Sequence, residues 1–526
     1  MRRAIFLLTA VGAAFLLAGG VGTPSSNSGV GEPSVAEAQT PGVGNPETLT
    51  GVLNAQWGDP RPGTGAEART EYVLTDDRGR EKKLLLDKRD TESVGGPLAF
   101  NGKRVEVRGR RVSNEPEERV EVQEIAFERP ADAAEARAKV ASGEPAAQAI
   151  ASSSNSKSWV TIGCRFADST GVTPKPMSYF GGPNVPGSVG SEGLMGTSAP
   201  GIDHYWQELS FGSVNLAGSR VERWYNLPGR RSAYVKGGSP NLIKIANDCT
   251  AAADKDVTFP NFFGINLVLN QDIGSSAWGG SRSLTRDGQT KNYGVTWLPP
   301  FAFGHDWVTH EMGHGFGMPH SSGPYSATYD SEWDVMSGAG LCGADPNGPN
   351  PLDSGNWVKH SPYECIADHT ISYHKDLVGW IPPERKYKAA PASNQTIAIE
   401  RLGQGLSDPP TSGYLMAQIP IKGSATRFYT IEARRNSGYD GHTNGRIPGQ
   451  AIVIHKVDTA LSSRNAQVVD VDPANTPNTN ANDAGAMWLP GETFTDAANG
   501  ITVEVKGETS TGENPSGYSV NISVSQ

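Results

Sequence analysis

The sequence has few cysteines, few histidines and no excess of positive charge. It contains 4 cysteines and 10 histidines in 526 residues, and its formal net charge is −10. Nucleic-acid-binding chains usually carry a basic patch and a high pI, so a pI of about 5.6 argues against that class of partner. Only 19% of residues are charged, and 63 glycines and 37 prolines favour a β-rich, loop-rich architecture over a helical bundle.

Hydrophobic runs long enough to span a membrane are also absent after the N-terminal segment. Two arginines precede an apolar stretch, Ala4 to Ala18, which is typical of an export signal and short for a membrane span. Ala36-Glu37-Ala38 offers a small-x-small cleavage motif. We therefore expect residues 1–38 to be a signal peptide and leader, and the mature protein to be secreted without a stable membrane span. A membrane anchor is the alternative.

The four cysteines are Cys164, Cys249, Cys342 and Cys365. An even count in an exported chain predicts two disulfides. Cys342 and Cys365 flank a loop rich in glycine, proline and asparagine, so we pair them and, by remainder, Cys164 with Cys249. Free buried thiols are the alternative. Because no cysteine lies between the export signal and residue 163, that segment has no thiolate to offer to a metal.

Three histidines fall within the eleven residues from His310 to His320. On a helix, His310 and His314 are four residues apart and face the same side, so both imidazoles can reach one metal ion. Gly317 can adopt a positive φ and turn the chain, which lets His320 return as a third ligand. Glu311 is placed to hold and deprotonate a metal-bound water. Three protein ligands with a fourth position open are typical of catalytic zinc.

The segment reads H-E-x-x-H-x-x-G-x-x-H, which is the signature of the metzincin zinc peptidases. Asp334-Val335-Met336-Ser337-Gly338 supplies the methionine that follows, on a tight turn that we expect to pass beneath the metal. A helix with incidental histidines is the alternative. The gathering of three of the 10 histidines in one short window argues against it.

More of the chain resembles two groups of secreted metzincins, the gametolysin-like and the immune-inhibitor-A-like peptidases. His204 to Gly212 and Trp224 to Pro228 look like the segment upstream of their zinc helix. Tyr373 to Trp380 resembles their K-x-x-L-G-W ending, with Val378 inserted. The resemblance covers roughly residues 158 to 510.

The resemblance implies zinc-dependent hydrolysis of peptide bonds in extracellular proteins, with Zn²⁺ as cofactor and a protein or peptide as substrate. It assigns His310, His314 and His320 as zinc ligands, Glu311 as general base and Met336 to the turn below the metal. We expect a monomer without a nucleic-acid partner. The alternatives are an exported adhesin or binding protein with an inert zinc site, and a zinc amidase that acts on cell-wall peptides.

Residue composition and hydrophobic pattern change along the chain, and 526 residues are too many for one ordinary hydrophobic core. Both observations predict a multidomain protein. Residues 39–130 suit a small OB-like β-barrel, which serves as an accessory module or a pro-segment. Residues 131–157 read as a linker. Residues 158–385 suit an α+β metzincin-like catalytic domain, and residues 386–526 a C-terminal β-sandwich-like domain.

Other polar residues have more than one interpretation. Tyr325 and Tyr329 follow the zinc motif, and packing or rim positions are favoured over contact with the metal. His369 and His374 are interpreted as surface or packing residues, since three ligands are already available. An oxygen-rich loop is interpreted as solvated, with Ca²⁺ as the alternative. Its members are Asp470, Asp472, Asn475, Asn478, Asn480, Asn482 and Asp483.

Overall fold

The computed structural model describes residues 46–112, 119–144, 155–325, 329–337, 365–409, 411–441, 447–461, 463–471, 480–511 and 514–525. The predicted signal peptide and leader lie outside these residues, as do Asp472, Asn475 and Asn478 of the oxygen-rich loop. The chain is a mixed α/β protein with several sheets and few helices. None of the helices within the described residues has the length and apolar composition needed to cross a membrane.

One large sheet contains 11 strands, in the order β2-β3-β5-β4-β1-β12-β13-β11-β6-β8-β7. It therefore runs through both the predicted barrel and the predicted catalytic domain. The physical reason is an antiparallel pairing between β1 and β12, two strands far apart in the sequence. The strands are β1 (Glu47–Pro60), β2 (Arg69–Thr75), β3 (Glu81–Leu85), β4 (Arg104–Val112), β5 (Arg119–Phe127), β6 (Trp159–Arg165), β7 (Gly187–Ser188), β8 (Arg220–Asn226), β11 (Gly264–Leu269), β12 (Ser276–Arg286) and β13 (Gln289–Leu298).

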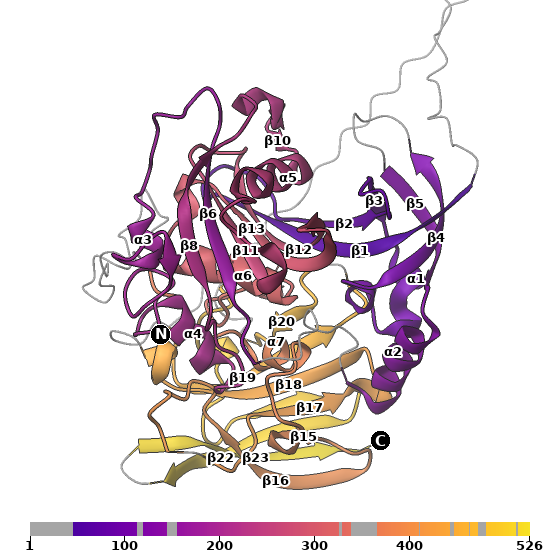
Figure 1. Cartoon of the computed structure of the whole chain (residues 1–526). Coiled ribbons are helices and arrows are strands. Elements are labelled where there is room, and N and C mark those ends of the chain that lie inside the picture. The colour runs from indigo at the N-terminus through magenta and orange to yellow at the C-terminus, as the bar shows by residue number, and fades with distance from the viewer. Residues whose placement is uncertain are drawn as a thin grey trace, which may run out of the picture. The chain divides into compact units, whose positions relative to one another are not determined.

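The first five strands close into a ring, because β1 pairs with both β2 and β4 while β3 pairs with β5 (Figure 1). Along β4, Val105 and Val107 are buried and Glu106 between them is exposed, which is the period of a strand with one face in a core. Two α-helices belong to the same part of the chain: α1 (Lys88–Thr91) follows β3, and α2 (Pro130–Ser142) follows β5. We call residues 46–144 the N-terminal module.

Helix α2 occupies the start of the predicted linker, residues 131–157. Pro130 stands in its first turn, where a missing N–H costs nothing, and Gly143 ends it in the left-handed conformation. Local capping signals thus favour a helix at the start of this stretch.

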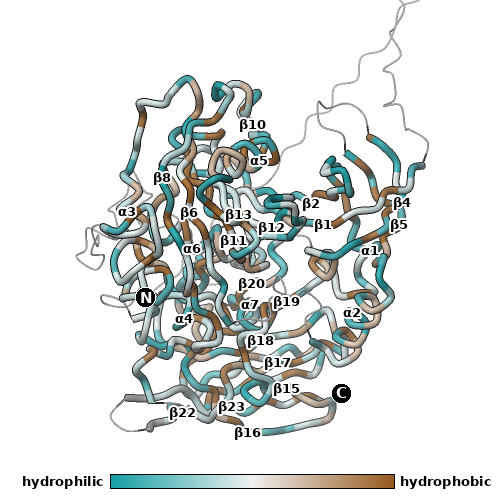
Figure 2. The backbone as a smooth tube through the Cα atoms, viewed as in Figure 1, coloured by the Kyte–Doolittle hydropathy of each residue, from teal (hydrophilic) through white to brown (hydrophobic). Residues whose placement is uncertain are grey.

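The central strands of the large sheet run mostly parallel. β11 pairs in parallel with both β6 and β13, and β6 pairs in parallel with β8, whereas β12 runs antiparallel to β13. All residues of β11 and all but the last of β6 are buried. Such continuous burial is typical of parallel strands that are covered on both faces. Figure 2 shows the apolar stretches along these interior strands.

Helices cover both faces of these strands. α6 (His305–Phe316) and α4 (Ile202–Leu209) share one hydrophobic cluster with Trp159, whereas α5 (Leu242–Ala253) shares another with Val160. Because consecutive residues of β6 point to opposite faces, the two clusters lie on opposite faces of the sheet. The helix that carries the zinc motif, α6, is thus packed against the same face as α4.

One disulfide confirms a prediction from the sequence. Cys164 on β6 and Cys249 on α5 are bonded, with their Cα atoms 5.8 Å apart, and both are buried. The bond joins the sheet to the helix that covers one of its faces. The other predicted pair, Cys342 with Cys365, includes Cys342, which lies outside the described residues.

Two further sheets form the C-terminal part of the chain, with strand orders β14-β20-β19-β18-β17-β15 and β16-β23-β22-β21. Ile399, Ile431 and Val520 belong to one hydrophobic cluster, so apolar side chains from both sheets share a core. The strands are β14 (Ser321–Ser322), β15 (Lys386–Lys388), β16 (Ser393–Glu400), β17 (Met416–Pro420), β18 (Arg427–Arg434), β19 (Ala451–Asp458), β20 (Ala466–Val468), β21 (Thr493–Asp496), β22 (Ile501–Thr511) and β23 (Asn514–Val524).

The remaining short elements connect these parts. They are α3 (Ser178–Gly181), α7 (Ser372–Leu377), β9 (Val235–Lys236), β10 (Ser239–Pro240), and the 3-10 helices η1 (Glu92–Val94), η2 (Pro97–Phe100), η3 (Arg231–Ala233), η4 (Phe259–Asn261), η5 (Pro300–Ala302), η7 (Pro383–Arg385), η8 (Ile421–Gly423), η9 (Gly438–Gly441) and η10 (Ala484–Ala486).

Candidate metal centre

Helix α6 ends where the sequence predicts a sharp turn. Gly317 adopts a φ of 104°, and its N–H bonds to the carbonyls of Gly313 and His314 as the left-handed cap of the helix. The chain then doubles back and brings the imidazole of His320 beside that of His314, with 3.1 Å between their Nε2 atoms. The local turn therefore places the third histidine of the motif next to the second.

The three histidines converge through their Nε2 atoms. The Nε2 of His314 lies 3.1 Å from the Nε2 of His310 and 3.1 Å from that of His320. The Nδ1 atoms of His310 and His314 each lie 2.7 Å from a backbone carbonyl, of Val335 and Met318 respectively. A carbonyl only accepts, so each Nδ1 carries the proton and each Nε2 presents a lone pair to the others. Converging lone pairs are the donor set of a metal site.

Burial and the Asp59 carboxylate shift the pKa values of His314 and His310 in opposite directions. All three side chains are buried. Burial lowers the pKa of His314 to about 3, so its ring stays neutral at physiological pH. Burial also acts to lower the pKa of His310, but the Asp59 carboxylate outweighs it and raises that pKa.

A fourth residue, Asp59 near the end of β1, lies against the three histidines. Its Oδ1 is 2.6 Å from the Nε2 of His320 and 3.3 Å from that of His310, and its Oδ2 is 3.3 Å from the Nε2 of His314. Asp59 is only 1% exposed. Burial acts to raise the pKa of its carboxyl, but the imidazoles of His320 and His310 outweigh burial and hold that pKa well below its usual range.

These four side chains, Asp59, His310, His314 and His320, form a buried group that can hold a metal ion, because their ligand atoms all lie within 4.8 Å of one another. We call them the metal group. Imidazole and carboxylate ligands suit several first-row metals, so the donor set by itself does not select one. Asp59 was not predicted as a site residue. It precedes His320 by 261 residues, and nothing in its local sequence distinguishes it from the rest of the 56 acidic residues of the chain.

Glu311 lies beside this group on the first turn of the motif. Its side chain is 0% exposed, and among the described residues neither carboxylate oxygen has a hydrogen-bond partner. Burial, together with the Asp59 carboxylate, raises the pKa of Glu311 well above its ordinary value. A side chain on Gly279 of β12 would collide with the Glu311 backbone carbonyl and carboxylate, so this glycine allows β12 to lie close to α6 beside Glu311. A buried carboxyl without a protein partner is costly and indicates a role toward a ligand.

The predicted turn around Met336 packs against α6. It is closed by hydrogen bonds from the Ser337 N–H to the Asp334 carbonyl, 2.9 Å, and from the Met336 N–H to the Asp334 side chain, 3.0 Å. Met336 is buried, and any side chain on Gly313 would collide with its sulfur. The sequence thus allows the turn to approach the helix between the first two histidines of the motif.

The two tyrosines of the following loop have different positions. The Tyr329 hydroxyl donates to the Oδ1 of Asp59 at 2.5 Å, and its ring centroid lies 5.5 Å from that of His320. The Tyr325 hydroxyl donates instead to Asp470 at 2.7 Å. Tyr329 therefore contacts the metal group through Asp59, whereas Tyr325 contacts the loop interpreted as solvated.

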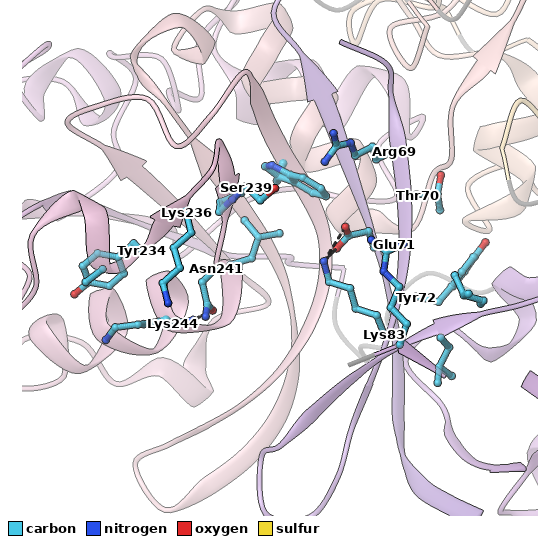
Figure 3. Close-up of a pocket in the computed structure, with 17 residues that line it drawn as sticks. Arg69, Thr70, Glu71, Tyr72, Lys83, Tyr234, Lys236, Ser239, Asn241 and Lys244 are labelled. Atoms are coloured by element: carbon cyan, nitrogen blue, oxygen red, sulfur yellow. Dashed lines mark hydrogen bonds and ion pairs between the residues drawn. The ribbon is translucent and has the colours of Figure 1, made fainter. Parts of the chain in front are cut away.

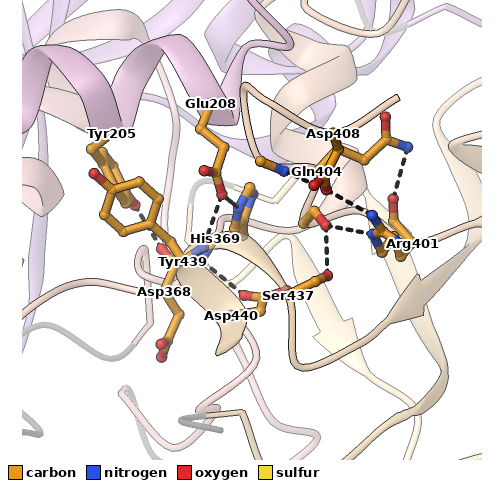
Figure 4. A network of polar contacts seen from close by, with 12 residues as sticks. Tyr205, Glu208, Asp368, His369, Arg401, Gln404, Asp408, Ser437, Tyr439 and Asp440 are labelled. Atoms are coloured by element: carbon orange, nitrogen blue, oxygen red, sulfur yellow. Dashed lines mark hydrogen bonds and ion pairs between the residues drawn. The ribbon is translucent and has the colours of Figure 1, made fainter. Parts of the chain in front are cut away.

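His369 and His374 are buried and belong to other polar contacts. His369 donates from Nε2 to Glu208 at 2.9 Å and lies 2.9 Å from the Lys375 Nζ through Nδ1 (Figure 4). His374 pairs with Asp334 at 3.0 Å. Both are packing residues. We call Glu208, His369 and Lys375 the polar relay.

Burial sets the charge states of the polar relay. It raises the pKa of Glu208 to about 7 and lowers the pKa of Lys375 to about 7. It also lowers the pKa of His369 well below its usual value, and the neighbouring cations of Lys375 and Arg434 add to that shift.

The described members of the oxygen-rich loop form hydrogen bonds through their oxygens within the protein. The Asn482 side chain accepts from the Glu332 N–H at 2.7 Å, and Asp483 accepts from the Gly485 N–H at 2.9 Å. Neither they nor Asp470 join a group of metal-ligating His, Cys, Asp or Glu side chains among the described residues.

No protein-family model matches the chain, and no curated protein matches it.

Proposed function

We propose that this chain is a secreted zinc-dependent endopeptidase of the metzincin type. The observation that carries the proposal is the convergence of three Nε2 atoms beside a buried carboxyl, Glu311, that has no partner among the described residues. The proposal includes the finer architecture, with an α+β metzincin-like catalytic domain between an OB-like barrel and a β-sandwich-like domain. Secretion and the assignment of zinc belong to it as well.

The residues of the motif divide the chemistry between them. His310, His314 and His320 would hold zinc, which supplies Lewis acidity and lowers the pKa of water when it is bound. Glu311 accepts a proton from the water whose oxygen attacks the scissile carbonyl carbon. As the C–N bond breaks, Glu311 returns that proton to the leaving amine. Its burial keeps bulk water from competing for the carboxylate.

The experiment that tests this function compares the zinc-loaded chain with its Glu311→Gln variant on casein, gelatin and peptidoglycan. Both are also made in an Asp59→Asn background, because Asp59 lies against the histidines. The variant should retain zinc and lose cleavage of protein by about 100-fold or more. Unchanged proteolysis by Glu311→Gln would reject the assignment of the base. Cleavage of peptidoglycan alone would favour the amidase.

An exported binding protein with an inert metal site is the second candidate, and one observation favours it. Asp59 brings the donor set to four side chains, and closed four-ligand sets are typical of structural zinc. A structural site has no use for a buried carboxyl such as Glu311. Absence of hydrolysis of any substrate, with zinc bound in both backgrounds, would favour this candidate.

A further inference from the structure

A groove lies between the N-terminal module and the part of the chain formed by α5 and the hairpin of β9 and β10. It consists of two hollows, of about 870 Å³ and about 190 Å³, whose walls share Lys83 and Asn241 among other residues. In the larger hollow, Lys236 and Lys244 lie on one side, and Arg69 and Lys83 of the module lie on the other (Figure 3). A hollow of this size can hold a ligand of several rings.

Positive charge dominates the larger hollow. Five lysine or arginine side chains line it against one glutamate, in a chain whose net charge is −10. The ammonium groups of Lys83 and Lys244 are each paired with a carboxylate, at 2.9 Å and 2.6 Å. Among the described residues, Arg69 and Lys236 have no carboxylate partner. Walls that carry one sign of charge focus the field and attract a ligand of the opposite charge. We call the two hollows the basic groove, and its cationic side chains are Arg69, Lys83, Arg119, Lys236, Lys244 and Arg282.

The smaller hollow is lined by a buried guanidinium group with unused donors. Arg282 of β12 is 1% exposed and forms an ion pair with Glu81. Its Nε and Nη1 atoms have no hydrogen-bond partner among the described residues. A buried donor that lacks an acceptor is costly, and an anionic oxygen in the hollow would remove that cost. Arg282 therefore points to an anionic ligand independently of the exposed lysines.

Neutral polar groups and apolar surface complete the walls of the larger hollow. Thr70 and Asn241 line it, as do Tyr72 and Trp278, whose hydroxyl and indole N–H are buried without a partner in the part of the chain that the structure describes. Leu85 adds an apolar side chain that is 44% exposed. A sugar chain with acidic substituents presents the complementary set, which consists of anionic groups, hydroxyls and apolar ring faces.

We propose that the basic groove binds an anionic oligosaccharide, with its sulfate or carboxylate groups on the cations and its hydroxyls on the neutral polar groups. An acidic peptide fits less well, because extended peptides are commonly held by an unpaired strand edge. β2 is paired with β1 and β3, and β3 is paired with β2 and β5. On the other wall, β10 contains Pro240, which has no N–H to donate.

The basic groove and the metal group lie on opposite faces of the large sheet. Trp278, which lines the groove, belongs to the hydrophobic cluster of α5, whereas Ala277 belongs to the cluster of α6. Consecutive residues of a strand point to opposite faces. Binding of the oligosaccharide is therefore a further function, which does not depend on the proposed peptidase chemistry.

The test measures binding of a fluorescently labelled heparin hexasaccharide to the full chain by fluorescence anisotropy. Arg69→Gln/Lys236→Gln removes one cation from each wall and should bind at least about 10-fold more weakly than wild type. Arg78→Gln/Lys255→Gln removes two exposed cations outside the groove and should bind as wild type does. An equal loss of affinity in both double variants, or no binding by wild type, would overturn the proposal.

Two competitors test the chemistry of the ligand. Maltohexaose, a neutral sugar of the same length, should not displace the labelled hexasaccharide, and displacement by it would show that charge is not the basis of binding. A hexaglutamate peptide should compete more weakly than unlabelled heparin hexasaccharide. Stronger competition by the peptide would make the groove a peptide site and would overturn the proposal.

A chelator keeps this inference separate from the proposed peptidase. Because the groove and the metal group lie on opposite faces, removal of the metal should leave the affinity for the hexasaccharide unchanged. Loss of binding together with the metal would contradict the placement of the sugar in the groove. Failure of the peptidase assay with Glu311→Gln bears on the metal group alone, so either proposal can fail without the other.

Discussion

The polar relay and the metal group are both buried and both contain histidine, and they differ in how their histidine nitrogens are satisfied. In the polar relay, the Lys375 ammonium group lies 2.9 Å from one nitrogen of His369, and the other nitrogen lies 2.9 Å from Glu208. In the metal group, the Nε2 atoms of His310 and His314 face each other at 3.1 Å with their Nδ1 atoms already bonded to carbonyls.

The difference separates a structural histidine from a ligand. Both groups are buried, so burial does not discriminate between them. A histidine nitrogen that faces a hydrogen-bond partner of the opposite kind is satisfied within the protein. Two unprotonated nitrogens that face each other are both acceptors, so they need a cation between them. Glu311, which lacks a partner among the described residues, strengthens the distinction.

Loss of a metal-group histidine should have the largest effect. His310→Ala removes one of three imidazole ligands, so the chain should lose bound zinc and all peptidase activity. Metal analysis of the purified chain measures the first effect. His369→Gln in the polar relay is the control and should retain zinc. Full zinc occupancy in His310→Ala would show that His310 is not a metal ligand, and the proposed difference between the two groups would be wrong.

Metal removal should destabilise the chain only through the metal group. A ligand present at 1,000 times its dissociation constant stabilises the folded state by about 4 kcal/mol. A chelator should therefore lower the melting temperature of wild type and of His369→Gln. The His310→Ala variant should not respond. A chelator effect of the same size in His310→Ala would place the stabilising ion elsewhere.

Breaking the polar relay should cost stability without loss of metal. His369→Ala leaves the buried Glu208 and Lys375 without their bridge, and an unsatisfied buried group costs about 1–3 kcal/mol. Urea unfolding of zinc-loaded protein gives this difference in free energy. Ala253→Gly on α5 is a control for loss of buried volume remote from both groups. Loss of zinc in His369→Ala would contradict the inference that the polar relay does not contribute to metal binding.

The smallest effect is a pH dependence of stability that arises from Lys375. Its pKa in the folded chain is about 7, against about 10.5 in the unfolded chain. Between these values the unfolded chain binds more protons, so the free energy of unfolding should rise with pH, by at most about 1.4 kcal/mol per unit. Glu208, with a pKa of about 7, adds nothing well above that pH.

Lys375→Met should flatten this slope in urea unfolding between about pH 8 and pH 9.5. The comparison uses the slope and not the absolute stability, because the substitution also leaves His369 without its nearest donor. The same slope in wild type and variant would show that the buried amine does not titrate as inferred.

Much of the local structure followed from short-range signals. Gly317 ends α6 as predicted, because only a left-handed residue closes that cap readily. Val105 and Val107 alternate with exposed residues, which is the period expected of strands in the β-rich region predicted there. The pairing of Cys164 with Cys249 came from counting and elimination, and the bond is present.

The helical period and the glycine turn determined by themselves which histidines would meet, because these residues lie within one helix and its cap. The position of Asp59 was decided only by the tertiary structure. Its place depends on the register of β1 against β12, which sums many backbone hydrogen bonds between segments with no local relation. The sequence alone therefore indicates a metal group with an open position, and the tertiary structure places a carboxylate there.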